Sequence, residues 1–169
     1  LTITAETPLL VRHAGLSDEA MLLAWANHPE TRQNSFSPDP IPAEDHRRWF
    51  CSRLRDLDGC RLYVVETEEA VPLGQVRFER QDPAWVISYS VAHLFRKRGL
   101  GRPLLEVALS KMRSEYPGAL ILGRVKADNL PSHKIFEALD FDASSNGGGL
   151  RISVCSDAGS WNNTYIPEL

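Results

Sequence analysis

The sequence predicts a single α/β domain built on a mixed central sheet, and three observations support this. Alternating apolar and polar residues at 73–78 and 85–91 are separated by a short turn, as in antiparallel strands. A stretch with helical spacing of apolar residues, 103–114, then leads to another apolar run at 119–125. Because this crossover passes through a helix, the strands before and after it are predicted to run parallel.

Composition excludes several classes of protein. The chain has 169 residues, enough for one domain, and its 43% hydrophobic and 24% charged residues are ordinary for a globular protein. A net charge of −3 argues against binding to nucleic acid or anionic membranes through overall charge. No apolar run approaches the roughly 20 residues of a membrane span, and no signal-peptide pattern is present. Cys51, Cys60 and Cys155 lack metal-ligand spacing and are expected to be reduced thiols in a cytoplasmic protein.

Further elements are predicted on both sides of the central region. The signals are apolar runs for strands, N-cap residues followed by helical spacing for helices, and clusters of proline, glycine and polar residues for loops. Before the central region they predict a loose terminus at 1–7, a strand at 9–12, a helix from Ser17 or Asp18 to about residue 26 and a loop at 30–42. A helix at 43–56, which buries Trp49, Phe50 and Leu54, and a strand at 62–65 follow. After the central region they predict a short helix opening at 129–132, a glycine turn at 147–149 and a strand at 150–155.

A basic glycine loop at 95–103 carries the clearest chemical signal. Gly99 and Gly101 allow the backbone to turn tightly and to bring N–H groups close to a ligand. The helix that begins there offers unpaired N–H donors and the positive end of its dipole, and Pro103 suits a first helical turn. Together with the surrounding arginines, these features predict a phosphate site. A simple turn before a helix would also explain the glycines.

Two motifs in this order resemble those of the GNAT (GCN5-related N-acetyltransferase) superfamily. Arg96-Lys97-Arg98-Gly99-Leu100-Gly101 is similar to the family's [Gln/Arg]-x-x-Gly-x-[Gly/Ala]. The second motif, Asn-x-x-Ser-x-x-Leu-Tyr-x-x-x-Gly-Phe, is matched by Asn129, Ser132, Ile135, Phe136, Asp140 and Phe141. The resemblance covers nearly the whole chain. It implies one domain over 1–169 with the GNAT fold, a mixed sheet of six to seven strands, about four helices, and a splayed parallel strand pair at the cofactor.

A narrower resemblance lies upstream, in residues 25–32 and 41–50. These blocks look like the branch that acetylates amino groups on nucleotide-linked sugars; the pseudaminic acid pathway enzyme and related RimJ/RimL-like proteins have similar blocks. This resemblance implies a small primary amine as the acceptor, with a nucleotide-linked amino sugar as one example.

The resemblance also implies where acetyl-CoA binds. The cofactor would lie between the strands at 85–91 and 119–125, with its pyrophosphate on the backbone N–H groups of 98–102. The implied cofactor-binding residues are Val91, Arg96, Lys97, Arg98, Gly99, Leu100, Gly101, Arg102, Asn129, Ser132, Lys134 and Phe136. No metal is expected.

The implied reaction is direct attack of a neutral amine on the thioester within a ternary complex. Two residues that many relatives use are replaced: Phe136 stands in place of a tyrosine, and Trp85 or Val86 in place of a glutamate. The candidate catalytic residues are therefore His46, Glu79, Ser88 and Tyr89, with His133 as a further candidate proton acceptor. Glu79 and His133 also fit ordinary surface positions, and strand polarity alone would explain the serine.

Acceptor binding is assigned to aromatic, amide and charged side chains upstream of the loop. Aromatic faces suit sugar rings or bases, and arginines suit diphosphates. The candidates are Trp25, Asn27, Arg32, Ser35, His46, Trp49, Gln75, Arg77 and Glu79, although core packing would also explain Trp49. Acetylation of protein α-amines and a non-catalytic acyl-CoA-binding module remain alternatives. No nucleic acid or membrane partner is expected, and the protein is predicted to be a monomer or homodimer.

Overall fold

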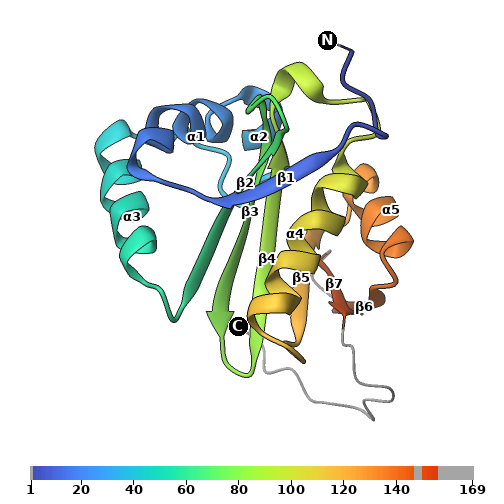
Figure 1. The fold of residues 1–169 in the computed structure, drawn as a ribbon. Helices are drawn as coiled ribbons and strands as arrows, with labels where there is room; N and C mark the ends of the chain where they lie inside the picture. The colour runs from blue at the N-terminus through green and yellow to red at the C-terminus, as the bar shows by residue number, and fades with distance from the viewer. Residues whose placement is uncertain (1, 147–149, 156–169) are drawn as a thin grey trace.

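A computed structural model of the chain describes residues 2–146 and 150–155. Its described strands form one seven-stranded sheet in the order β1-β2-β3-β4-β5-β7-β6 (Figure 1). The strands are β1 (Leu9–His13), β2 (Cys60–Thr67), β3 (Pro72–Gln81), β4 (Ala84–Val91), β5 (Ile121–Lys126), β6 (Asp142–Asn146) and β7 (Leu150–Cys155). The predicted class, a mixed sheet of six to seven strands with flanking helices, is confirmed.

Helices cover both faces of this sheet. Among the described residues they are η1 (Leu16–Asp18), α1 (Glu19–Ala26), α2 (Pro29–Asn34), α3 (Ala43–Arg55), η2 (His93–Phe95), α4 (Gly101–Glu115) and α5 (Leu130–Ala138), where η marks a 3-10 turn. Figure 1 shows α1 and α3 on one side of the central strands and α4 and α5 on the other. No helix in the described ranges has both the length and the apolar character that crossing a bilayer demands.

The predicted strand directions are confirmed. Strands β2, β3 and β4 form an antiparallel meander, in which Tyr63 lies opposite Val76 and Val76 lies opposite Tyr89. Strand β4 then pairs in parallel with β5, but only from Trp85↔Ile121 to Ile87↔Gly123. Both strands continue past this point, so residues 88–91 of β4 extend beyond the part of the sheet that β5 shares. This is the geometry of a splayed strand pair.

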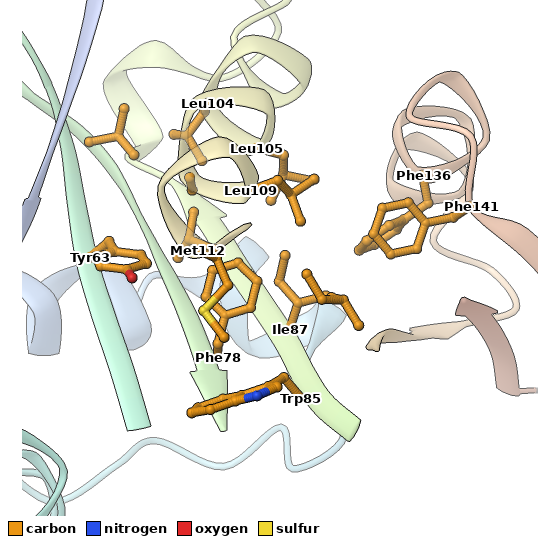
Figure 2. Close-up of a cluster of buried hydrophobic side chains, with 14 of the residues drawn as sticks. Tyr63, Phe78, Trp85, Ile87, Leu104, Leu105, Leu109, Met112, Phe136 and Phe141 are labelled. Carbon is orange, nitrogen blue, oxygen red and sulfur yellow. The ribbon is translucent and has the colours of Figure 1, made fainter. Parts of the chain in front are cut away.

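The main core lies between the sheet and helices α4 and α5. It gathers side chains that alternate along the strands, such as Tyr63, Phe78 and Ile87, under α4 (Figure 2). The helix contributes the five residues predicted from its periodicity, Leu104, Leu105, Ala108, Leu109 and Met112, and all five are buried. Each such side chain contributes about 1.5–3 kcal/mol on burial. The frame that carries the basic loop is therefore firmly held.

A smaller core holds α1 and α3 against the opposite face of β2. Leu22, Trp25 and Phe50 pack there with Cys60 and Leu62. Burial raises the pKa of the Cys60 thiol to about 11, so this thiol stays protonated at neutral pH.

Three local predictions were wrong or incomplete. Residues 1–7 are not loose where they are described, because Ile3 is only 5% exposed and packs with Leu73 and Leu100. The expected loop at 30–42 begins with helix α2, since Pro29 occupies a first-turn position where its missing N–H costs nothing. Strand β6 was not predicted, because its polar sequence has no apolar alternation. The predicted glycine turn at 147–149 lies outside the described residues.

Candidate active site

The basic loop after β4 is a tight turn that is anchored by the buried side chain of Leu100. Lys97 and Gly99 adopt φ angles of 60° and 74°, in the left-handed region that favours glycine. Leu100 at the start of α4 is buried with Ile3 and Leu73, whereas Lys97, Arg98, Gly99 and Arg102 are exposed. Exposed backbone and basic side chains thus surround the N-terminus of the 15-residue helix α4. This arrangement suits an anion with several oxygens.

Gly101 fits where α4 approaches α5. A Cβ atom at this position would lie 2.6 Å from Cδ1 of Ile135, closer than packing allows. The second motif therefore packs directly on the first, which explains why the two occur together.

Arg96 has different partners from those predicted. Its Nε donates to the Val91 carbonyl at 3.0 Å, and its Nη2 donates to Oγ1 of Thr31 at 2.5 Å. Its Nη1 lies 3.0 Å from Oε2 of Glu30 and 3.2 Å from Nδ1 of His28. The side chain is only 16% exposed. Arg96 therefore joins the basic loop to α2, and its guanidinium is not free for the predicted phosphate contact.

The start of α5 faces β4 across the splayed pair. Oδ1 of Asn129 accepts from the Ser132 N–H at 3.3 Å and caps the helix. The Ser132 hydroxyl lies 3.0 Å from the Tyr89 hydroxyl, and burial raises the pKa of this phenol although the Ser132 hydrogen bond opposes the rise. Three predicted residues, Tyr89, Asn129 and Ser132, are thus brought together, while Lys134 is exposed on α5.

Phe136 belongs to the core. It is 3% exposed, and its ring lies 6.0 Å from the Tyr89 ring and 4.9 Å from the Phe141 ring, edge to face in both cases. A Cβ on Gly123 would come within 2.9 Å of the Phe136 ring, so Phe136 packs directly over β5. Its predicted cofactor contact is not supported by this placement, because core neighbours surround the ring.

The opposite face of β3 and β4 is polar. Gln75 lies beside Ser90, with Nε2 3.4 Å from the serine Oγ, and Arg77 lies beside Ser88. Because successive side chains in a strand alternate between faces, Ser88 and Tyr89 point to opposite sides of the sheet. The structure therefore separates two of the predicted catalytic residues.

Arg77 stands out on this polar face. Its Cζ lies 5.0 Å from the centre of the Trp49 ring, a cation–π arrangement, and its Nε lies 3.3 Å from Oε2 of Glu79. None of the described hydrogen bonds involves its guanidinium, and its buried Nε meets no hydrogen-bond geometry within the described residues. The side chain is 27% exposed. Trp49 is half-buried and packs against the smaller core, in line with its predicted place on the buried stripe of this helix.

Glu79 is held between two arginines. Its Oε1 lies 3.0 Å from Nε of Arg53, and its Oε2 faces Arg77. Both carboxylate oxygens of Glu79 therefore face arginines, and the contact with Arg77 helps to orient that guanidinium.

His46 is buried to 3% exposure on the inner side of α3. Its ring stacks on the Phe50 ring with 5.8 Å between centroids and lies tilted against the Trp49 ring with 5.4 Å between centroids. Its Nδ1 has no hydrogen-bond partner within the described part of the chain. Burial lowers the pKa of His46, an effect partly opposed by the charge of Glu19, so the ring is neutral at pH 7.

The other histidine candidate is a structural contact. His133 is buried, and its Nε2 lies 2.9 Å from the carbonyl oxygen of Lys126. The contact ties α5 to the end of β5. The predicted role of His133 as a proton acceptor is not supported by this position.

Four of the predicted acceptor residues instead hold the segment between α1 and α3. Asn27 exchanges two hydrogen bonds with the backbone of Ile41, at 2.9 and 2.8 Å. Arg32 donates to Oγ of Ser35 at 3.0 Å and to three carbonyl oxygens, those of Ala26, Ser37 and Asp39. Trp25 is part of the smaller core. Trp25, Asn27, Arg32 and Ser35 therefore all make structural contacts, and their acceptor roles stay predictions.

Two basic residues near the site were missed. Arg124 and Lys126 lie on β5, and by strand alternation they share the polar face with Arg77. Arg124 donates to Oε1 of Gln81 at 3.0 Å, and Lys126 donates to the Gln33 carbonyl at 3.0 Å. The alternation of Ile121, Gly123 and Val125 with these residues was the available signal. Within the described ranges, no group of three or more His, Cys, Asp or Glu side chains could hold a metal ion.

The comparisons with known proteins agree with this geometry. A family model described as "Acetyltransferase (GNAT) domain" matches residues 9–142. The chain therefore belongs to the GNAT acetyltransferase family, as the two motifs predicted. Members of this family transfer an acetyl group from acetyl-CoA to an amine, so acetyl-CoA is the cofactor.

Solved structures share the fold at low sequence identity. Spermidine N-acetyltransferase from Vibrio cholerae, in complex with CoA and spermine, matches with a TM-score of 0.75 and 16% identity over 86% of this chain and 92% of its own. RimL, a ribosomal L7/L12 α-N-protein acetyltransferase in complex with coenzyme A, gives 0.75 and 16% over 91% and 97%. The aminoglycoside acetyltransferase AAC(6')-Ib with coenzyme A gives 0.74 and 15% over 89% and 95%. Among curated proteins, no relative matches.

Proposed function

We propose that the protein acetylates a small primary amine that also carries an anionic group, as a nucleotide-linked amino sugar does. The observation that carries the proposal is Arg77. None of the described hydrogen bonds involves its guanidinium, which the Trp49 ring and Glu79 hold in place. Such a guanidinium is suited to bind a phosphate or carboxylate in a bidentate manner.

The guanidinium of Arg77 attracts an anion and repels a polycation, which favours an anionic acceptor over a polyamine. Its charged neighbours carry both signs: Arg53 and Arg77 lie beside Glu79, and Nη1 of Arg53 also lies 3.8 Å from Oδ2 of Asp56. The Trp49 ring beside Arg77 suits a sugar or base.

The cofactor site that we propose combines the loop and the splayed strands. The exposed backbone of Arg98, Gly99 and Arg102 at the start of α4 would hold the pyrophosphate, with Lys97 adding charge. Residues 88–91 of β4, which lie past the segment shared with β5, would pair with the pantetheine, and Val91 ends this edge. Asn129 and Ser132 would line the other side.

The two faces suggest how protons move during transfer. Bound acetyl-CoA supplies a thioester whose carbonyl carbon accepts the amine, so that an N–C bond forms and the C–S bond breaks. The polar face with Ser88 would receive the amine, and the ring of His46 on α3, which is 3% exposed, would accept its proton through water. Tyr89, held by Ser132 on the other face, would be available to protonate the departing thiolate. The neutral state of His46 is the one that a base requires.

Other features of the protein are inferred more broadly. We infer a single domain over residues 1–169, since the family match spans 9–142 and both motifs lie on one sheet. The free thiols of Cys51 and Cys60 support a reducing, cytoplasmic location. For the oligomeric state, we propose a monomer or a homodimer.

Thiol release from acetyl-CoA with a panel of amines tests the acceptor class. We expect the highest kcat/KM for amino sugars linked to nucleotides, lower values for neutral amino sugars, and the lowest for spermidine. Arg77→Gln should raise the KM for the anionic acceptor by about tenfold, the factor given by one lost charge-assisted hydrogen bond, and leave the affinity for CoA unchanged. Arg80→Gln, an exposed change on the same strand, is the control.

Other outcomes would select an alternative. Turnover on N-terminal peptides but not on sugar nucleotides would identify a protein α-amine acetyltransferase. Binding of CoA without thiol release from any amine would identify a non-catalytic module. Equal KM values for charged and neutral amines would remove the assigned role of Arg77.

The loop is tested separately by CoA binding. Gly101→Glu should abolish binding, since it places a carboxylate at the proposed phosphate site. Gly101→Ala adds the same Cβ contact with Ile135 without the charge, so it separates repulsion from packing. Equal losses in both variants would assign the effect to packing.

A further inference from the structure

Helix α2 bridges the ends of the two strands that bound the cofactor gap. On the β4 side, the contacts are made by Arg96, which follows β4 and η2. On the β5 side, the final residue of the strand, Lys126, donates its Nζ to the Gln33 carbonyl at 3.0 Å. In Figure 1, α2 lies beside the end of β4 that leads into the basic loop. The helix therefore crosses from one splayed strand to the other.

The β4 side of this bridge is the stronger. Arg96 is fixed to the Val91 carbonyl, and from there it reaches His28, Glu30 and Thr31. The His28 ring also stacks on His93 with 4.8 Å between centroids. One side chain thus links the end of β4 to the first turn of α2.

Helix α2 has no hydrophobic anchor of its own. None of its residues is buried, in contrast to α1, α3, α4 and α5. It is attached to the sheet through the polar contacts of Arg96 and Lys126, and to its own chain neighbours through Arg32, which donates to the Ala26 carbonyl, and through its covalent links to α1 and α3. Segments with few buried apolar contacts open at low free-energy cost. The polar contacts of α2 therefore act as a latch, by which we mean contacts that can break without disrupting the core.

The gap that α2 crosses is the one proposed for acetyl-CoA. Strands β4 and β5 pair only as far as Ile87 and Gly123, and α2 lies at the open end beyond. A cofactor arm between residues 88–91 and β5 would pass beneath α2. Release of that arm would then require the Arg96 or the Lys126 contact to break.

We propose that α2 is a strap that closes over the bound cofactor, with Arg96 and Lys126 as its two latches. The inference rests on the proposed function, since it takes acetyl-CoA to occupy the gap. Arg96 is a positioning residue, because it acts through α2 and does not touch the reacting atoms. Helix α2 belongs to the segment that joins α1 to α3, and α3 carries His46 and Trp49, so the latch connects the cofactor side to the acceptor side.

CoA dissociation measured by stopped flow tests the strap. The double variant Glu30→Gln/Thr31→Val breaks the β4-side latch from α2, at residues outside the proposed phosphate site. We expect it to speed CoA release about tenfold, which corresponds to about 1.4 kcal/mol, with little change in the association rate. Arg96→Gln should have the same effect, and combining it with the double variant should add little, because all three changes break one latch. Arg48→Gln, an exposed change on α3, is the control.

Amide hydrogen exchange gives a second readout. Residues 29–34 should exchange more slowly when CoA is added to the wild-type protein, and this protection should be lost in the latch variants. The strap would be overturned if CoA release were unchanged in Glu30→Gln/Thr31→Val, or if the exchange rate at 29–34 did not change when CoA is added. Thiol release by the wild-type protein would remain intact in either case. Failure of the wild-type protein to bind CoA would instead overturn the proposed function and the strap with it.

Discussion

The two faces of the central sheet differ in the polarity of the side chains that they carry. Under α4 and α5, the strands present apolar side chains that form one continuous core. Under α1 and α3, the same strands present Gln75, Arg77, Ser88 and Ser90. Adjacent residues on one strand therefore differ in role: Phe78 packs in the main core, whereas Arg77 lies on the polar face. The comparison teaches that one face carries the main core, whereas the other combines the smaller core over β2 with polar groups of β3 and β4 that are available for a ligand.

Charges on the polar face are themselves of two kinds. Near β1, Arg12 pairs with Asp18 at 2.7 Å and with Glu66 at 2.9 Å, so these charges are satisfied. Toward β4, Arg77 keeps donors without partners among the described residues. Satisfied charges stabilise the fold, whereas an unsatisfied buried donor costs free energy unless a ligand fills it.

Phe78→Ala tests the apolar face and should have the largest effect. Phe78 is fully buried in the main core, so its truncation should lower the free energy of unfolding by about 3–5 kcal/mol. Arg77→Gln, at the neighbouring position on the other face, should change it by less than about 1 kcal/mol. Urea denaturation followed by circular dichroism measures both. Similar losses in the two variants would contradict the division of tasks between the faces.

Asp18→Asn tests the satisfied charges and should have an intermediate effect. The hydrogen bond from Arg12 lowers the pKa of Asp18 below 3.8, opposed by burial and helped by the Gly15 N–H. A carboxylate with a lowered pKa stabilises the fold above its ordinary pKa, and this stabilisation disappears as the pH falls through the folded value. We expect a loss of about 1–3 kcal/mol at pH 7 that shrinks toward pH 2. Thermal unfolding at both pH values checks this; a loss that is independent of pH would assign the effect to packing.

His46→Phe tests the buried imidazole and should have the smallest effect. Because burial lowers the pKa of His46 below 6.5, the unfolded chain binds a proton more readily than the folded one. Stability should therefore fall as the pH drops below 6.5, with a slope of at most about 1.4 kcal/mol per pH unit. Phenylalanine can keep the stacking on Phe50 and should reduce this slope between pH 7 and 5. An unchanged slope would show that other groups cause it.

Local patterns predicted the elements whose side chains repeat with a clear period. The spacing of Leu104, Leu105, Ala108, Leu109 and Met112 indicated the buried side of α4, and the alternation at 85–91 indicated the two faces of β4. Helix α2 and strand β6 were missed because their residues are polar and carry no such period. Ile3 was missed because a single apolar residue in a polar terminus has no neighbours to form a pattern with.

Side-chain roles in the site were less predictable, because a residue type does not reveal its partners. Arg32 and Arg96 looked like ligand-binding arginines, yet both form hydrogen bonds within the protein. Glu79 was a candidate base, and the structure pairs its carboxylate with Arg53 and Arg77. Arg124 lay in a predicted strand whose alternation indicated its face, and the register with β4 showed that this is the face of Arg77.

The sequence by itself determined the family, the basic loop and the crossover, since backbone turns, helix dipoles and apolar periods depend on residues close together in the chain. Only the tertiary structure decided which charges stay available. Arg77 keeps unpaired donors, whereas Arg96 fastens α2 across the splayed strands, and both outcomes depend on partners far away in sequence. The physical reason is that a guanidinium satisfies its donors with whichever acceptors folding brings within about 3 Å.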